Sequence, residues 1–407
     1  MVKRAVNIYA ESFKGLSNEI WWLALITFIN RAGTMVLPFL SLYLTEDLNL
    51  TLSQVGWVMS AFGVGSLAGS WLGGKLTDKV GFYKVMFWSL LSTGFLFLML
   101  QYINSFMGFT IGIFFTMLIA DTFRPAMFVS LKVYSKLENR TRSLTLIRMA
   151  INLGFSFGPF LGGIIISTLG YGGLFWVDGL TCIAAVFLMK AVLSPKKMNS
   201  KNIEVVQVEE VEENPKSVFK DYSYVIFLTV VFLMGFIFLQ LFTTMPLYYK
   251  DVHGLTELQI GLIMSLNGFI IFLLEMPLIH YIEKTLWDKM KVISWSLFLM
   301  ALSFLVLNIS GWIGVLIIGM LFITVGEMLA FPFTNSFAMS RAPKGRDGMY
   351  LAYYTMAFSF AHIFSAKTGM EIIDRFGFNA NWYLMGSLGF VAILLMFVLR
   401  NMLLSNK

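Results

Sequence analysis

The sequence predicts an all-α integral membrane protein whose twelve transmembrane helices form two pseudo-symmetric bundles of six. Three observations support this fold class: an apolar composition, regularly spaced apolar runs, and a repeat that relates the two halves of the chain. Hydrophobic residues make up 57% of the 407 residues and charged residues 13%, whereas soluble domains are about 45–50% apolar and about 25% charged. The mean hydropathy is +0.76.

Long apolar runs locate the membrane spans. A helix needs about 20 mostly apolar residues to cross a bilayer. Helices are the only structure that satisfies the backbone in lipid here, because strand and turn signals are too few for a closed barrel. Six spans are expected at residues 20–44, 53–76, 82–103, 106–134, 143–169 and 172–193, and six more at 222–249, 256–282, 288–308, 312–339, 347–373 and 379–401.

One polar stretch, residues 194–221, separates the two sets of spans. Eleven of its 28 residues are charged, and such a composition buries too little apolar surface to offset the entropy of ordering. We therefore interpret it as a flexible linker. The expected organisation is an N-terminal segment (1–19), a first bundle (20–193), the linker (194–221), a second bundle (222–401) and a C-terminal tail (402–407).

The positions of the basic residues predict the orientation. Of the 30 Lys and Arg residues, 24 lie on the side of the N-terminus, the linker and the C-terminus, 2 lie on the other side, and 4 lie within spans. Basic loops stay in the cytoplasm, so both termini are expected there, in a bacterial cytoplasmic (inner) membrane. The net charge of +7 arises from these loops, and no nucleic-acid partner is expected.

The two halves repeat each other. Tyr43, Leu50-Thr51, Gln54, Gly56, Met59-Ser60 and Gly63 recur 205 residues later as Tyr248, Leu255-Thr256, Gln259, Gly261, Met264-Ser265 and Gly268. With a drift of two residues, Pro125 matches Pro332. Two parallel six-helix repeats joined by a cytoplasmic linker are typical of secondary transporters, whose substrate site lies near the midplane at the repeat interface.

The loop after the second span reads Gly74-Lys75-Leu76-Thr77-Asp78-Lys79-Val80-Gly81-Phe82-Tyr83-Lys84. It resembles the G-x-L-x-D-[RK]-x-G-x-[RK] signature of the major facilitator superfamily, although Phe82 and Tyr83 stand where that family usually has basic residues. The resemblance implies a conformational latch between the halves on the cytoplasmic side. Its residues here are Gly74, Asp78, Lys79, Gly81 and Lys84.

The fifth span carries a second signature, with Gly154, Gly158, Pro159, Gly162 and Gly163. This pattern resembles the G-x-x-x-G-P-x-x-G-G signature of the drug:proton antiporters of the superfamily. Small residues four apart let helices pack closely, and Pro159 is expected to kink the span. The signature favours efflux, although packing glycines do not themselves select a direction.

Charged residues inside the spans are costly in lipid and are by default candidates for function. Arg31 lies in the first span, Asp121 and Arg124 in the fourth, and Glu327 in the tenth. The resemblance places these helices around a central cavity. An apolar cavity favours the protonated form of a carboxyl group, so Glu327 is the first candidate for proton coupling, followed by Asp121 and Glu275. The alternative for Asp121 and Arg124 is that they pair on one helix face.

The remaining candidates line the expected substrate cavity. The set is Arg31, Arg124, Gln240, Phe236 and His362. The two arginines serve as counter-charges or hold an anionic substrate group. His362 alternatively packs against a hydroxyl group, and Glu275 alternatively forms a gating pair with Arg148. Lys367 is expected to extend to the outer interface, and Asp178 is interpreted as an interfacial cap.

These residues predict a proton-coupled secondary active transporter that works by alternating access, most simply an antiporter exporting small amphipathic compounds. The alternative is a proton-coupled uptake symporter for peptides or other small solutes. Asn30-Arg31, Leu42-Tyr43-Leu44 and Ile151-Asn152-Leu153-Gly154 resemble segments of the proton-coupled oligopeptide transporters. However, Asn30 and Ala32 replace the acid and the aromatic residue that flank the arginine in their E-x-x-E-R-F-x-Y-Y signature.

No enzyme is predicted, because no metal-ligand cluster, nucleotide-binding loop or nucleophile constellation is present in the sequence. The single Cys182 lies in an apolar segment, which leaves neither disulfide nor thiolate–metal chemistry. We expect no metal and no cofactor, with the proton gradient as driving force. The expected partners are a small-molecule substrate, protons and the lipid bilayer, and the protein is expected to work as a monomer.

Overall fold

The structure is a computed structural model, and it describes residues 15–136, 139–195, 218–285, 287–343 and 347–405. Within these ranges the chain contains eleven helices long and apolar enough to cross a membrane. The last of them, Met349–Leu404, contains Gly377, whose φ of 81° and ψ of 173° mark the meeting point of two helices. The twelve predicted crossings are therefore present. Residues 1–14 and 196–217, which hold most of the expected N-terminal segment and linker, lie outside the described residues.

The first half begins with an interrupted helix. Its elements are α2 (Asn18–Ala32), α3 (Val36–Leu42), the π-helical turn η1 (Tyr43–Asp47), α4 (Leu52–Val80), α5 (Phe82–Leu100), α6 (Phe106–Ala120), α7 (Phe123–Tyr134), α8 (Arg140–Leu169) and α9 (Gly172–Val192). The first span thus consists of α2, α3 and η1, and the fourth of α6 and α7. Each predicted span begins within a few residues of the start of the helix that forms it.

The second half repeats this plan. Its elements are η4 (Val218–Lys220), α10 (Tyr222–Phe238), α11 (Gln240–Thr243), α12 (Met245–Asp251), α13 (Glu257–Lys284), α14 (Lys289–Leu305), η5 (Val306–Asn308), α15 (Gly314–Arg341) and α16 (Asp347–Ser405). The seventh span is interrupted twice, between α10, α11 and α12. The repeat therefore includes a broken first helix in each half.

The chain forms two compact units. The first holds residues 1–37 and 64–199, and the second holds residues 38–63 and 200–407. Residues 38–63, which hold the end of the first span and the start of the second, group with the second half.

A face of small residues on α4 explains this grouping. A Cβ atom added to Gly56 meets the Lys367 Cα at 3.0 Å, and one added to Gly63 meets the Ile363 backbone nitrogen at 3.1 Å. Between these glycines the Ser60 hydroxyl donates to the Ile363 carbonyl at 2.6 Å. The first half of α4 thus lies directly on the backbone of α16, an approach that larger side chains would prevent.

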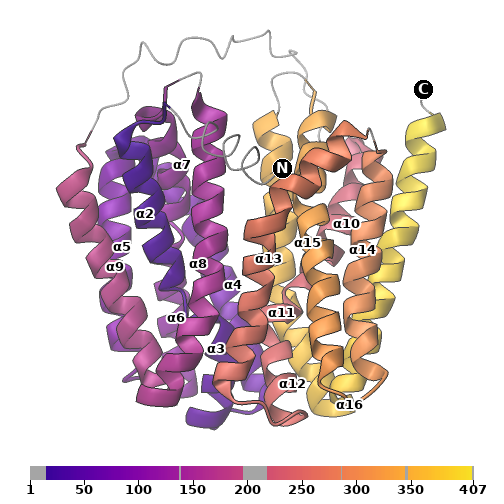
Figure 1. The fold of residues 1–407 in the computed structure, drawn as a ribbon, viewed down its shortest axis with the longest axis horizontal. Coiled ribbons are helices and arrows are strands. Elements are labelled where there is room, and N and C mark those ends of the chain that lie inside the picture. The colour runs from indigo at the N-terminus through magenta and orange to yellow at the C-terminus, as the bar shows by residue number, and fades with distance from the viewer. Residues whose placement is uncertain (1–14, 137–138, 196–217, 286, 344–346, 406–407) are drawn as a thin grey trace, which may run out of the picture. The chain divides into compact units, whose positions relative to one another are not determined.

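In the first unit, α2 packs against α8 and α9, and α5 packs against α6, α7 and α9 (Figure 1). The contact of α5 with α9 depends on two facing glycines. A Cβ atom added to Gly94 or to Gly179 lies 2.8 Å from the carbonyl oxygen of the other. Buried Met127, Ile147 and Met189 belong to the apolar cluster of this unit.

In the second unit, α10 and α14 both pack against α16, and α15 packs against α13 and α14 (Figure 1). Asp221 anchors the start of this unit. Its carboxylate accepts a bond from the Tyr224 backbone N–H at 3.2 Å and two bonds from the Arg341 guanidinium at 2.8 Å. The residue that closes the predicted linker is therefore the cap of α10.

The repeat is visible in the turns that precede α4 and α13. The Thr51 backbone N–H donates to the Gln54 side chain at 3.0 Å, and the Thr256 N–H donates to Gln259 at 2.9 Å. Residues 49 and 254, which are also 205 apart, both have a left-handed backbone: φ is 50° at Asn49 and 62° at Gly254. The same turn therefore starts the second helix of each half.

We expect Gly254→Ala to destabilise the protein by about 1 kcal/mol, because a Cβ atom is strained in the left-handed region and nothing else lies within 4 Å of it. The matched variant Asn49→Gly, at the repeat position, relieves this strain and should leave stability equal or slightly higher. The melting temperature of the purified protein in detergent measures both effects. An unchanged melting temperature for Gly254→Ala would contradict the assignment of the turn.

Candidate functional site

A buried carboxylate holds the interruption of the first span. The Asp178 side chain, on α9, is 0% exposed. Its oxygens accept bonds from the Met35 N–H at 2.9 and 3.1 Å and from the Val36 N–H at 3.0 Å. These are the free N–H groups at the amino end of α3, which need an acceptor inside a membrane. Asp178 is therefore an internal helix cap rather than the interfacial cap suggested by the sequence.

Small residues let neighbouring helices reach this interruption. A Cβ atom added to Gly33 lies 2.9 Å from the Thr181 Cβ, so only glycine fits against α9. On the opposite side, a Cβ atom added to Gly154 lies 2.5 Å from the Arg31 Cβ, and one added to Gly158 lies 3.4 Å from the Thr34 carbonyl oxygen. The first two glycines of the fifth-span signature thus pack on the broken helix. Gly162 and Gly163 are buried further along α8, which continues through Pro159.

Arg31 lies at the end of α2, one residue before the last helical position. Its Nε is buried and has no hydrogen-bond partner among the described residues. The guanidinium carbon lies 5.7 Å from the centre of the Phe155 ring. Arg124 and Asp121 are within electrostatic range of this guanidinium. An unsatisfied buried donor of this kind is a group that a ligand can satisfy.

The fourth span is broken at Asp121. Helix α6 ends at Ala120 and α7 begins at Phe123. The half-buried Asp121 carboxylate accepts a short hydrogen bond from the Ser66 hydroxyl on α4. Arg124 is exposed, and it forms no ion pair with Asp121 in the described part of the chain. The structure therefore brings Arg31, Asp121 and Arg124 together in the first unit without pairing the last two.

The second unit holds a separate cluster around Glu327. The half-buried Glu327 carboxyl group accepts a bond from the Asn267 amide at 2.9 Å. The same amide nitrogen donates to the Thr324 hydroxyl at 3.1 Å, which joins α13 to α15. Glu275, on α13, is 8% exposed and lies within electrostatic range of Glu327. No ion pair of the described residues includes Glu327, so its one polar partner is a neutral amide.

Gln240 lies at the interruption of the seventh span and is fully engaged by protein groups. Its amide nitrogen donates to the Ser365 carbonyl at 3.0 Å and hydroxyl at 2.9 Å. Its amide oxygen accepts from Thr244 at 2.6 Å and from Asn381 at 3.2 Å. The Ser365 hydroxyl also donates to the Phe236 carbonyl at 2.7 Å. These bonds account for the burial of Gln240, and its predicted contact with substrate stays a prediction, as does that of Phe236.

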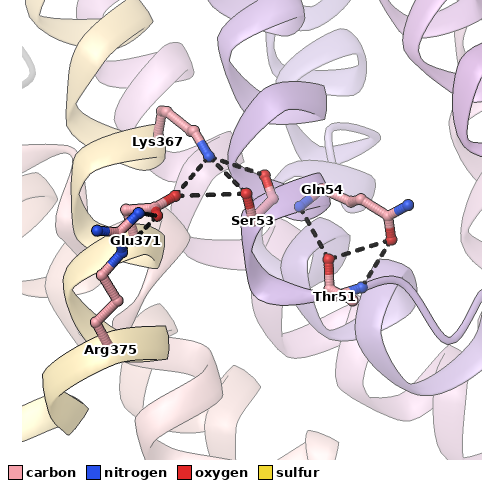
Figure 2. A network of polar contacts seen from close by, with 6 residues as sticks. All are labelled: Thr51, Ser53, Gln54, Lys367, Glu371 and Arg375. Carbon is pink, nitrogen blue, oxygen red and sulfur yellow. Dashed lines mark hydrogen bonds and ion pairs between the residues drawn. The ribbon is translucent and has the colours of Figure 1, made fainter.

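Figure 2 shows a polar cluster between the start of α4 and the middle of α16. The Lys367 ammonium donates to the Ser53 hydroxyl at 2.7 Å and to the Glu371 carboxylate at 2.8 Å. Glu371 also accepts from the Arg375 guanidinium at 2.8 Å. Lys367, which the sequence predicts to extend to the outer interface, lies 5.2 Å from the centre of the Trp57 ring and links two helices. One helical turn before Lys367, the half-buried His362 ring lies 5.2 Å from that of Phe62.

A second ion pair lies at the same end of this unit. The Lys250 ammonium binds the Glu257 carboxylate and lies 3.6 Å from that of Glu46. It therefore ties the ends of η1, α12 and α13 together. Burial lowers the pKa of the nearby His253 imidazole, so this ring is mostly neutral at pH 7 and adds little charge to the cluster.

The predicted latch loop is a one-residue turn. Helix α4 ends at Val80 and α5 begins at Phe82, and Gly81 between them has a φ of 88°. Only glycine adopts this backbone without strain. Asp78, Lys79 and Lys84 are exposed, and Gly74 has no atom within 4 Å of an added Cβ. The latch function itself stays a prediction.

Comparisons with known proteins decide the family. The model of the Major Facilitator Superfamily matches residues 23–366. The chain belongs to this superfamily. It is thus a transporter of small molecules in a membrane and not an enzyme, and the resemblance seen in the loop after the second span is confirmed.

Three curated members of the superfamily illustrate the likeness. The MFS-type transporter YqjV of Bacillus subtilis (strain 168) is 24% identical over 400 residues, which cover 94% of this chain and 93% of YqjV. A Na(+), Li(+), K(+)/H(+) antiporter of Planococcus maritimus is 21% identical, covering 88% and 90%. Multidrug resistance protein 2 of Bacillus subtilis (strain 168) is 21% identical, covering 84% of each.

Solved structures show the same superfamily fold. The crystal structure of a peptide transporter POT in complex with sulfate superposes with a TM-score of 0.79 at 16% identity, covering 96% of this chain and 95% of the other. At this identity the likeness concerns the fold alone.

Sequence reasoning missed the neutral partners of the intramembrane charges. Ser66 and Asn267 lie within spans, and nothing in their own helices marks them as partners of Asp121 and Glu327. Ser66 lies two turns before the superfamily loop motif, and Asn267 belongs to the repeat segment that ends at Gly268. Asp178 was the clearest available sequence signal of a buried polar contact, because a carboxyl group in a transmembrane helix requires a partner.

We expect Asp178→Ala to destabilise the protein by at least about 2 kcal/mol, because the buried Met35 and Val36 N–H groups lose their acceptor and each unsatisfied buried donor costs about 1–3 kcal/mol. Asp178→Asn retains one acceptor oxygen at nearly the same volume and should lose less. Melting temperatures in detergent rank the variants. Equal stability of Asp178→Ala and the unmodified protein would show that α3 does not depend on this cap.

Proposed function

We propose that this superfamily member is a proton-coupled antiporter that exports small amphipathic compounds, with Glu327 as the main proton-binding group. The observation that carries the proposal is the environment of Glu327. An intramembrane carboxyl group that is bound by a neutral amide exchanges a proton more readily than one fixed by a cation, because the amide does not oppose protonation with a full positive charge.

Other observations support exchange and export. The glycines of the drug:proton antiporter signature are used in packing, since Gly154 and Gly158 contact the interruption beside Arg31. Two relatives that span most of the chain are named as a cation/H(+) antiporter and as a multidrug resistance protein. Rings of Phe238, Phe242, Phe331 and Phe358 form a contiguous aromatic group beside the interruption of the seventh span, which suits apolar parts of varied compounds.

The proposed mechanism is alternating access. Protonation of Glu327, with Asp121 and Glu275 as further carboxyl groups, removes negative charge from the membrane interior and shifts the equilibrium between the two access states. Substrate binding competes with this proton. The bond from Lys367 to Ser53, which joins α16 to α4, forms in one access state and breaks in the other.

A second function, uptake with protons, is favoured by one specific feature. Arg31 and Arg124 lie close together in the first unit, and Arg31 Nε lacks a partner among the described residues. Such a pair suits an anionic group, for example the carboxylate of a peptide or of another small acid. The two functions differ in the direction of proton movement.

The decisive experiment uses proteoliposomes with a pH-sensitive dye inside and no imposed gradient. Candidate amphipathic cations, organic acids and dipeptides are added outside. Antiport makes the lumen alkaline, because protons leave as the compound enters, whereas symport makes it acidic. Protein-free liposomes are the control. If the transported compound made the lumen acidic, that result would contradict antiport and support the uptake function.

We expect Glu327→Gln to reduce pH-gradient-driven transport to the level of protein-free liposomes, because glutamine cannot bind and release the proton. Exchange of labelled for unlabelled substrate, which needs no net proton movement, should persist. Glu283→Gln is the matched control, because Glu283 is an exposed carboxyl group at the end of the same α13 that carries Asn267. Gradient-driven transport by Glu327→Gln at the unmodified rate would remove Glu327 from the coupling step.

We expect Arg124→Ala to weaken transport, because the exposed guanidinium supplies positive charge beside Asp121 and Arg31. Arg124→Lys keeps the charge and should retain more activity, unless planar bidentate recognition is needed. Initial rates over a range of substrate concentrations separate a raised KM from a lowered kcat. Unmodified kinetics for Arg124→Ala would exclude it from the substrate site.

A further inference from the structure

A cavity in the first unit lies between the start of α5 and the end of α9, and it includes Lys84 of the expected latch. Its volume is about 600 Å³, within the range of about 300–1,000 Å³ typical of ligand pockets. The lining residues are Tyr83, Lys84, Phe87, Trp88, Lys190, Ala191, Val192, Leu193, Ser194 and Pro195. The lining thus combines two basic and three aromatic side chains with a short apolar wall.

The cavity is electropositive. Lys84 and Lys190 are both exposed, and none of the ten lining residues is acidic. Neither lysine takes part in an ion pair with another described residue. Two ammonium groups on one cavity, without a protein counter-charge in the described part of the chain, favour a ligand that carries negative charge.

The position of the cavity in the span gives it one polar and one apolar end. Lys84 lies in the first turn of α5 and Lys190 in the last turn of α9, at the end of the unit that the basic residues place in the cytoplasm. Trp88, one turn deeper, is 61% exposed. Tryptophan prefers the depth of the lipid headgroups, and lysine extends from there into water.

One wall of the cavity is held in place. The chain after α9 does not turn away from the unit, because the Tyr134 hydroxyl donates to the Ser194 carbonyl at 2.7 Å. Leu193, between this bond and the helix, is 3% exposed. The lining therefore does not need to fold around a ligand, which lowers the entropic cost of binding.

We propose that this cavity binds an anionic phospholipid, with the phosphate between Lys84 and Lys190 and the start of the acyl chains beside Phe87 and Trp88. A phosphate is the anionic group that all such lipids share, and the exposed indole ring explains why an amphipathic ligand fits better than a small anion. Basic pockets between helix ends on the cytoplasmic side are a recurrent form of lipid recognition. Lys84, which the superfamily resemblance assigns to the latch, thereby also contacts lipid.

The test compares lipid binding by the full-length protein and by the double variant Lys84→Gln/Lys190→Gln. The protein is titrated in detergent with phosphatidylglycerol, and bound lipid is counted by native mass spectrometry alongside the melting temperature. We expect about thirtyfold weaker binding in the variant, because each lysine near an anionic lipid contributes about 1 kcal/mol. Single variants should each lose part of the affinity, and added salt should weaken binding to the unmodified protein.

Two controls make the result specific. Lys132→Gln/Lys136→Gln removes the same charge from exposed residues at the same end of the unit, outside the cavity, and should bind phosphatidylglycerol like the unmodified protein. Phosphatidylcholine should bind weakly to all proteins. An equal loss of phosphatidylglycerol binding in the control pair would show that binding reflects general surface attraction and not the cavity. An equal shift in melting temperature with inorganic phosphate alone would show that the ligand is a soluble anion and not a lipid.

Discussion

The bonds from the Met35 and Val36 backbone N–H groups to the Asp178 carboxylate are the constraint on which the first unit depends. A helix that breaks inside a membrane exposes N–H groups that lipid cannot satisfy. Here a side chain of the sixth span supplies the acceptor, and the glycines of the first and fifth spans admit the neighbouring helices to the break. Arg31 occupies the end of the helix that precedes the break, so the position of its guanidinium follows from the cap.

In the second unit, neutral polar side chains surround the interruption of the seventh span. Gln240 at the interruption of the seventh span is bound by Asn381 of the twelfth, 203 residues after Asp178, close to the 205-residue repeat. In each half the last helix therefore supplies a polar side chain to the break in the first. The carboxyl group of Asp178 is in the unit that carries Arg31 and Arg124, and the amide of Asn381 is in the unit that carries Glu275 and Glu327. The two halves thus share one arrangement of helices and differ in the polar and charged side chains that these helices carry.

The spans, the repeat and the family could be predicted from the sequence, because these depend on long apolar runs and on local turn residues such as Gly81. Sequence reasoning also selected Arg31, Asp121 and Glu327, since a charged residue within an apolar span can be recognised without knowing its partner. It did not find the partners, because Ser66 and Asn267 are ordinary polar residues whose role appears only when two helices meet. Nor did it find that Gln240 is satisfied by protein groups, or that residues 38–63 group with the second half.

The grouping of residues 38–63 with the second half has a consequence for biosynthesis. Ser53 leaves the ribosome and enters the membrane long before its partners exist, since the bonds to Lys367 and Glu371 join residues 314 and 318 positions apart. The glycine and serine face at the start of the second span therefore stays without its partner until the eleventh span has been inserted. A first half made on its own would lack these contacts of α4 with α16.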